Sequence, residues 1–216
     1  MYVSDKYVFI HMNKAAGVSV KDWLIKYHKA RICRYKHAPL RMLPEKHYGK
    51  MKIGCVRDPF DWYVSYFNYL CQEKRITTLN FKRFVEIYVR HPRALFDFMG
   101  SKVRKQFENL YPPKTDLPIG GWTFHFINYF FFDSRKILRG ELPCRFENHN
   151  MEYLMKTENL KEDMIRVFGD YYQKSIIKWP HKNKSKRRQK NYWTPDLRKL
   201  IIEREKDLME YLGYTD

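Results

Sequence analysis

Short apolar runs alternate with helical patterns along this chain. Runs rich in β-branched, aromatic and other apolar residues have the length and composition of buried strands; they are residues 7–10, 52–56 and 151–156. A stretch with apolar residues at helical spacing follows each run. Strands that alternate with helices predict an α/β fold. The length of 216 residues predicts one domain over residues 1–216.

The first strand leads into a turn of small residues with one cation. Residues 12–17 read Met-Asn-Lys-Ala-Ala-Gly, and the helical pattern begins at Val18 and runs to His28. Such a turn directs several backbone N–H groups toward one point at the positive end of a helix, and Lys14 adds a full charge. The turn therefore predicts an anion site, although an ordinary strand-to-helix connection stays open. A nucleotide-triphosphate P-loop is disfavoured, because G-x-x-x-x-G-K-[ST] is absent.

The second strand places an arginine at its end. Arg57 follows the apolar run directly, Asp58 is a suitable helix N-cap, and Pro59 suits the first helical position. Ser65 lies two turns into the predicted helix. Neither Arg57 nor Ser65 is specific for a function when taken alone.

Together the two stretches resemble sulfotransferases that use 3′-phosphoadenosine 5′-phosphosulfate (PAPS). Residues 13–19, NKAAGVS, are similar to the family's P-K-T-G-G-T-S, which cradles the 5′-phosphosulfate. Residues 56–65, VRDPFDWYVS, are similar to V-R-[DN]-P-[YFW]-[DE]-R-x-x-S, whose Arg and Ser hold the 3′-phosphate. The resemblance covers most of the chain. It implies a P-loop-like, three-layer α/β fold, with a small central parallel β-sheet flanked by helices.

The resemblance also implies roles for individual residues. Lys14 is expected to stabilise the leaving phosphate oxygen, while Arg57 and Ser65 bind the 3′-phosphate. A loop before the last helix is expected to close over the nucleotide through Asn183 and Ser185. The residues expected to hold the 5′ end, mostly through backbone N–H groups, are Lys14, Ala15, Ala16, Gly17, Val18 and Ser19.

The first motif departs from the family at two positions. Ala15 and Val18 stand where the family has hydroxyl residues, so two side-chain hydrogen bonds to phosphate are missing. Backbone N–H groups, Lys14 and Ser19 have to hold that end instead. In the second motif, Trp62 replaces the usual arginine.

A histidine is the expected catalytic base. His37 lies upstream of the Arg-Asp-Pro motif, where some glycan sulfotransferases of this family carry such a base. An imidazole suits the task because its unperturbed pKa of about 6.5 lets it accept a hydroxyl proton near neutrality. His11, at the end of the first strand, and His125, in an aromatic run that is also typical of a core, stay open as alternatives.

The rest of the chain adds expectations about structure. Asn80 is predicted to cap a helix over residues 81–89, and a basic helix is predicted over residues 93–110. Thr194 is predicted to cap a last helix that stops at Gly213.

Charge and cysteine content narrow the possible partners and compartment. Lys and Arg number 42 against 24 Asp and Glu, a net charge of +18, which favours anionic partners without naming one. The spacing of the 4 cysteines predicts neither a zinc site nor a disulfide framework. No signal segment or membrane-spanning run is visible, so a bare catalytic domain in the cytoplasm is expected.

The leading hypothesis is therefore a PAPS-dependent sulfotransferase that requires no metal. PAPS would be the co-substrate and 3′-phosphoadenosine 5′-phosphate (PAP) the product. The acceptor would be a hydroxyl, most naturally on a carbohydrate, and nucleic acid would not be required. Two alternatives stay open: a nucleotide-kinase-like phosphoryl-transfer enzyme, and a basic nucleic-acid- or polyanion-binding protein that keeps the fold without catalysis.

Overall fold

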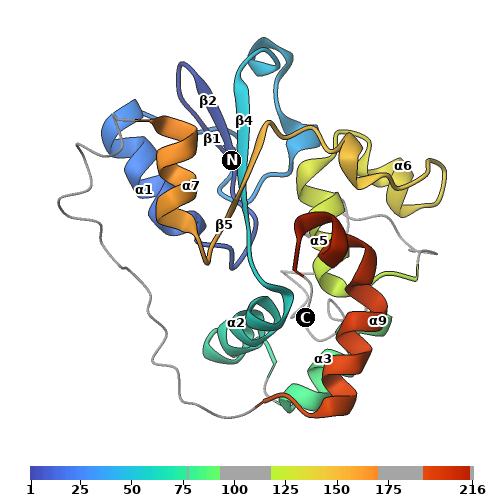
Figure 1. The fold of residues 1–216 in the computed structure, drawn as a ribbon. Helices are drawn as coiled ribbons and strands as arrows, with labels where there is room; N and C mark the ends of the chain where they lie inside the picture. The colour runs from blue at the N-terminus through green and yellow to red at the C-terminus, as the bar shows by residue number, and fades with distance from the viewer. Residues whose placement is uncertain (77, 93–117, 170–191, 215–216) are drawn as a thin grey trace. The chain divides into compact units, whose positions relative to one another are not determined.

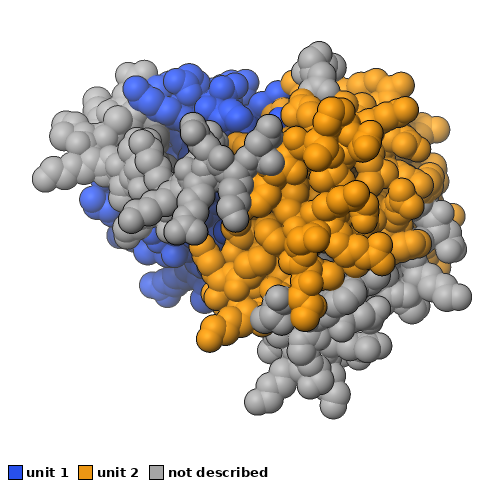
Figure 2. Space-filling view, turned by 90° about the horizontal axis from the view of Figure 1, so that it is seen from below, with its two compact units in different colours: residues 1–58, 150–190 blue, residues 59–149, 191–216 orange. Residues whose placement is uncertain are grey.

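The computed structural model describes residues 1–76, 78–92, 118–169 and 192–214. Within them the chain divides into two compact units, each built from two separate segments of sequence. Unit 1 comprises residues 1–58 and 150–190, and unit 2 comprises residues 59–149 and 191–216 (Figure 2). This division does not test the expectation of one domain over residues 1–216, which stays a prediction.

Unit 1 is built on a mixed five-stranded sheet with the strand order β3-β1-β2-β4-β5 (Figure 1). The strands are β1 (Tyr2–Val3), β2 (Tyr7–Ile10), β3 (Arg31–Ile32), β4 (Met51–Val56) and β5 (Tyr153–Lys156). The pairs β2–β4 and β4–β5 are parallel, whereas β1 runs antiparallel to β2 and to β3. The α/β class is confirmed. The expectation of a purely parallel sheet is wrong, because β1 adds to β2 through a tight turn in which Ser4 and Tyr7 bond to each other.

Helices α1 (Gly17–His28) and α7 (Leu160–Phe168) lie side by side against one face of this sheet (Figure 1). Alternate strand residues point to that face and meet apolar residues spaced along the helices. The buried cluster includes Phe9, Ile53, Cys55 and Met155 from the strands, with Val20, Trp23, Leu24, Met164 and Phe168 from the helices. The bounds of α1 are close to the predicted residues 18–28, and α7 is the helical stretch predicted after the apolar run 151–156.

Unit 2 is helical in its described residues. Its α-helices are α2 (Pro59–Gln72), α3 (Phe81–Arg90), α5 (Gly121–Phe130), α6 (Ser134–Leu138) and α9 (Pro195–Leu212). Two caps are as predicted: Asn80 accepts the N–H of Arg83, and Thr194 accepts the N–H of Leu197. Gly213, in the left-handed conformation, ends α9. The basic helix expected over residues 93–110 lies outside the described residues.

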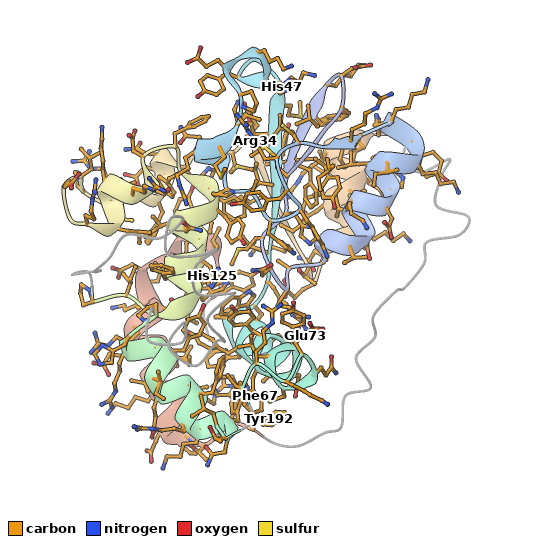
Figure 3. The ribbon with its side chains drawn as sticks, turned by 180° about the vertical axis from the view of Figure 1, so that it is seen from behind. Arg34, His47, Phe67, Glu73, His125 and Tyr192 are labelled. Carbon is orange, nitrogen blue, oxygen red and sulfur yellow. The ribbon has the colours of Figure 1, made fainter. Side chains whose placement is uncertain are left out.

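Aromatic side chains form the core of unit 2. Every residue of α5 is buried, which confirms the core interpretation of the aromatic run. Trp62 is fully buried and stacks on Tyr66, with ring centroids 5.0 Å apart. The departure from the family motif at residue 62 thus supplies a core side chain. Phe67 lies near Tyr192 (Figure 3), with ring centroids 6.2 Å apart.

Candidate functional site

The candidate site lies in unit 1, where the parallel strands β2, β4 and β5 end. Carboxyl ends of parallel strands meet at one edge of a sheet, which is where α/β proteins bind ligands. His11 follows β2, Arg57 follows β4 and Thr157 follows β5. The sheet therefore brings the loop of the first motif and Arg57 of the second to a single edge.

The loop between β2 and α1 has a backbone shape suited to an anion. Lys14 has φ of 64° and Ala16 has φ of 50°, whereas Ala15 and the helical Gly17 are not in the positive-φ region. Alternation between left-handed and right-handed residues turns successive N–H groups into one concavity. The loop ends at the first turn of α1, where the helix dipole leaves partial positive charge. Within that turn the N–H of Ser19 donates to the carbonyl oxygen of Ala16 at 3.0 Å. Ala16 is the N-cap of α1, and its side chain accepts no hydrogen bond from the first turn.

Basic side chains converge on this loop. Burial lowers the pKa of Lys14, and repulsion from Arg57 and then from Lys36 lowers it further. Like charges that act on one another at this range disfavour their charged forms. An anion placed among them would remove that penalty, so the electrostatics favour a multiply charged anion.

The His11 side chain packs against Gly17, the first residue of α1. It is only 3% exposed, and its Nδ1 atom has no hydrogen-bond partner among the described residues. Its ring lies so close to Gly17 that a Cβ added there would overlap ring atoms. Glycine is therefore required at residue 17 by the close approach of the His11 ring.

His37 packs on His11, with ring centroids 4.4 Å apart. The Nδ1 atom of His37 lies 2.9 Å from the carbonyl oxygen of His11. Because a carbonyl can only accept, His37 donates from Nδ1, and its neutral ring carries a lone pair on Nε2. Burial lowers the pKa of His37 to about 4; the bond to His11 opposes this shift, and Lys36 and Lys14 reinforce it. The ring is thus neutral at physiological pH, with a free Nε2 lone pair, and is a weaker base than an unperturbed imidazole.

The other expected site residues differ in burial and in the unit to which they belong. Ala15, at 0% exposure, is buried in the core as a whole residue. Val18 and Ser19 are partly buried in the first turn of α1. Ser65 is partly buried on α2, in unit 2, and its pairing with Arg57 stays a prediction. Asn183 and Ser185 lie outside the described residues.

His125, the third candidate base, is a core residue of unit 2. It is 1% exposed on α5 (Figure 3) and bonds through Nε2 to the hydroxyl of Tyr88. Its ring lies among Trp62, Tyr66 and Tyr129. These contacts favour a structural role for His125 and leave His37 with His11 as the histidines at the loop.

Sequence reasoning missed Lys36 and Glu158. Lys36 precedes His37 in an irregular segment that carries no helical or strand pattern, so only the folded chain shows its proximity to Lys14. Glu158 begins the stretch Glu-Asn-Leu over residues 158–160, where an acidic residue ordinarily favours the start of a helix such as α7. Its carboxylate instead accepts the N–H of Asp58 at 2.7 Å. The E-N-L stretch after β5 was the available signal.

Comparison of the chain with family models, with curated proteins and with solved structures found no match. In the part of the chain that the structure describes, no group of three or more His, Cys, Asp or Glu lies together as a metal site would require. None of the helices described here combines the length and apolarity needed to cross a bilayer.

Proposed function

We propose that this protein is a sulfotransferase that moves a sulfuryl group from PAPS to an acceptor hydroxyl, with a carbohydrate as the preferred acceptor. The observation that carries the proposal is the loop over residues 13–17, where positive-φ residues lead into a helix start and Lys14 lies near enough to Arg57 and Lys36 for their charges to lower its pKa. The resemblance of both sequence motifs to PAPS-dependent sulfotransferases supports it. A P-loop-like, three-layer arrangement is part of the same proposal.

The residues present fit a phosphosulfate nucleotide. Its phosphate and sulfate groups carry several negative charges, which match a site where cations repel one another. Arg57 offers a planar fork of donors that suits a phosphate, and it stands at the end of β4 as the 3′-phosphate assignment requires. Ser65, Asn183 and Ser185 would complete the nucleotide site, and the N–H groups from Ala15 to Val18, with Ser19, would hold the 5′ end.

The chemistry assigned to the chain is positioning and charge stabilisation. PAPS supplies a sulfuryl group bonded to a phosphate leaving group. His37 would take the acceptor proton at Nε2 as the acceptor oxygen bonds to sulfur, and the sulfur–oxygen bond to the phosphate breaks with its electrons on the phosphate. Lys14 and the loop N–H groups would stabilise that charge. PAP leaves as the second product.

The direct test is transfer of ³⁵S from labelled PAPS to a panel of glycans. The wild-type chain is expected to label at least one acceptor, and Lys14→Ala to lower kcat by about 10²–10³-fold. Lys46→Ala is the matched control, since Lys46 is an exposed lysine of the same unit, on the 3₁₀ turn Glu45–His47. Equal rates for Lys14→Ala and Lys46→Ala would refute the role of Lys14. Labelling of an acceptor from γ-labelled ATP would instead favour the kinase-like alternative.

The net charge of +18 supports a second candidate, a polyanion-binding protein without catalysis. Binding through phosphate contacts weakens steeply with salt, because counterions are released on association. Nucleic-acid affinity that collapses between low and physiological salt, without any preference for PAP over AMP, would favour this candidate.

A further inference from the structure

Arg57 stands between two backbone groups that the end of β5 holds in place. On one side, the carbonyl oxygen of Val56 accepts both the N–H and the Oγ1–H of Thr157, each at 2.9 Å. On the other side, the N–H of Asp58 donates to Oε1 of Glu158 at 2.7 Å. The peptide groups before and after Arg57 are therefore both fixed by consecutive residues of the neighbouring strand's end.

The bond from Glu158 lies beyond the regular sheet. The β4–β5 ladder ends at the pair Val56 and Lys156, where the chain after β4 turns into α2. The N–H of Asp58 thus has no carbonyl of β5 opposite it in the ladder, and a side chain supplies the acceptor. Rotation about the backbone dihedrals of Arg57 would break one of these bonds, so together they set the direction in which its side chain leaves the sheet.

The charge of Glu158 makes this bond informative. A carboxylate bonded to the backbone next to Arg57 weakens the attraction of that region for anions. The acceptor oxygen of Glu158, and not its charge, is therefore what holds the Asp58 N–H in place. A glutamine at residue 158 keeps an acceptor oxygen and removes the unfavourable charge.

We propose that Glu158 and Thr157 are positioning residues that hold Arg57 in the orientation needed to bind the 3′-phosphate. This inference rests on the proposed function of Arg57. Glu158 acts through the backbone N–H of Asp58, and Thr157 acts through the carbonyl of Val56. Selectivity for a 3′-phosphate then depends on residues about a hundred positions away in the sequence, at separations of 100 and 101.

The test is calorimetric titration of the full chain with PAP and with AMP, which lacks the 3′-phosphate. Glu158→Ala should weaken PAP binding about tenfold, the scale of one lost hydrogen bond to a charged group, and leave AMP binding nearly unchanged. Glu158→Gln should bind PAP as tightly as the wild type or more tightly. Thr157→Val, which keeps the backbone bond, should weaken PAP binding by a smaller factor, about threefold.

A double-mutant cycle separates positioning from general loosening of the fold. If Glu158 acts through Arg57, adding Glu158→Ala to Arg57→Ala should cause no further loss of PAP affinity. Glu162→Ala is the matched control, because it removes an exposed carboxylate from the first turn of α7. Should Glu158→Ala fail to fold, the same cycle is made with Thr157→Val.

The outcomes distinguish this inference from the proposed function. Equal losses for PAP and AMP, or an additive loss in the Arg57→Ala background, would overturn the positioning role while PAP binding itself stands. Failure of Glu158→Gln to restore affinity would also count against it. Absence of PAP binding by the wild-type chain would overturn the proposed function and the inference with it.

Discussion

The Nδ1 atom of His37 lies 2.9 Å from the carbonyl oxygen of His11, and this contact selects the tautomer of His37. The Nε2 atom is left as the proton acceptor, on a ring whose pKa is about 4 because it is largely buried. A base must be neutral to act, so activity should be retained at neutral pH and lost on acidification.

The first prediction concerns this pH dependence. The value of kcat/KM reports the free enzyme, so it should be flat from about pH 6 to about pH 8 and fall at lower pH with a midpoint near the His37 pKa of about 4. His37→Gln should lower kcat by about 10²–10⁴-fold and abolish the acid limb. His91→Gln, an exposed histidine in unit 2, is the control. An acid limb that survives in His37→Gln would assign the base elsewhere.

The second prediction concerns the packing of His11 on Gly17. Gly17→Ala places a methyl group where the His11 ring lies, so either the ring or the helix start must move. We expect a loss of about 1–3 kcal/mol in the free energy of unfolding and a marked fall in PAP affinity. Denaturant unfolding and calorimetry measure the two effects.

Gly49→Ala is the matched control for that substitution. Gly49 is exposed in the same unit, and an added Cβ there would meet no atom within 4 Å. It should change neither stability nor affinity. If Gly17→Ala behaves like Gly49→Ala, the close approach of His11 has no role in the site.

The third prediction concerns a buried carboxylate in unit 2. Glu205 of α9 is 1% exposed and accepts hydrogen bonds from the hydroxyl of Tyr63 at 2.5 Å and from the N–H groups of Trp122 and Thr123 at 3.0 and 2.9 Å. It therefore caps the first turn of α5 from another helix. Glu205→Ala removes the acceptor of the Tyr63 hydroxyl and of the Thr123 N–H and leaves the Trp122 N–H only a 3.3 Å contact with Tyr63, so it should lower the free energy of unfolding by about 3 kcal/mol. Glu203→Ala, exposed on the same helix, should change it by less than about 0.5 kcal/mol.

The pH dependence of stability checks the same group. Burial raises the pKa of Glu205 above its usual value despite the hydrogen bonds that oppose the shift. The folded state then holds this proton more tightly than the unfolded state, so the contribution of Glu205 to stability declines as pH rises from the unfolded pKa through the raised one. The free energy of unfolding of the wild type, measured relative to that of Glu205→Gln, should therefore fall as pH rises. A difference that grows in favour of the wild type as pH rises would contradict it.

The elements predicted from the sequence are those whose signals are local. Strands β2, β4 and β5 and helices α1, α7 and α9 carry their own apolar periodicity, and α9 also has its own N-cap, Thr194. The short strand β1 was missed because two residues show no alternation, and its antiparallel pairing depends on the turn at Ser4. Glu205 was missed because its partners lie more than 80 residues away, and on its own helix it looks like one surface charge among several.

The candidate site was predicted in the same uneven way. Lys14 and Arg57 stand in motifs, and the topology brings the loop and the end of β4 to one sheet edge. The contributions of Lys36 and Glu158 depend on contacts with residues distant in sequence, near Lys14 and Asp58, which no local pattern predicts. His37 was predicted as the base by resemblance, while the carbonyl that sets its tautomer appears only in the folded chain.

The most direct test of the central claim is a thermal-shift titration with PAP beside AMP and ATP, on the wild type and on Arg57→Ala. A ligand that binds only the folded state stabilises it by about 2.7 kcal/mol at a hundredfold excess over Kd. We predict that PAP raises the melting temperature well above the effect of AMP, and that Arg57→Ala removes this difference. Equal shifts with PAP and AMP on the wild type would contradict a 3′-phosphate site and, with it, the sulfotransferase proposal.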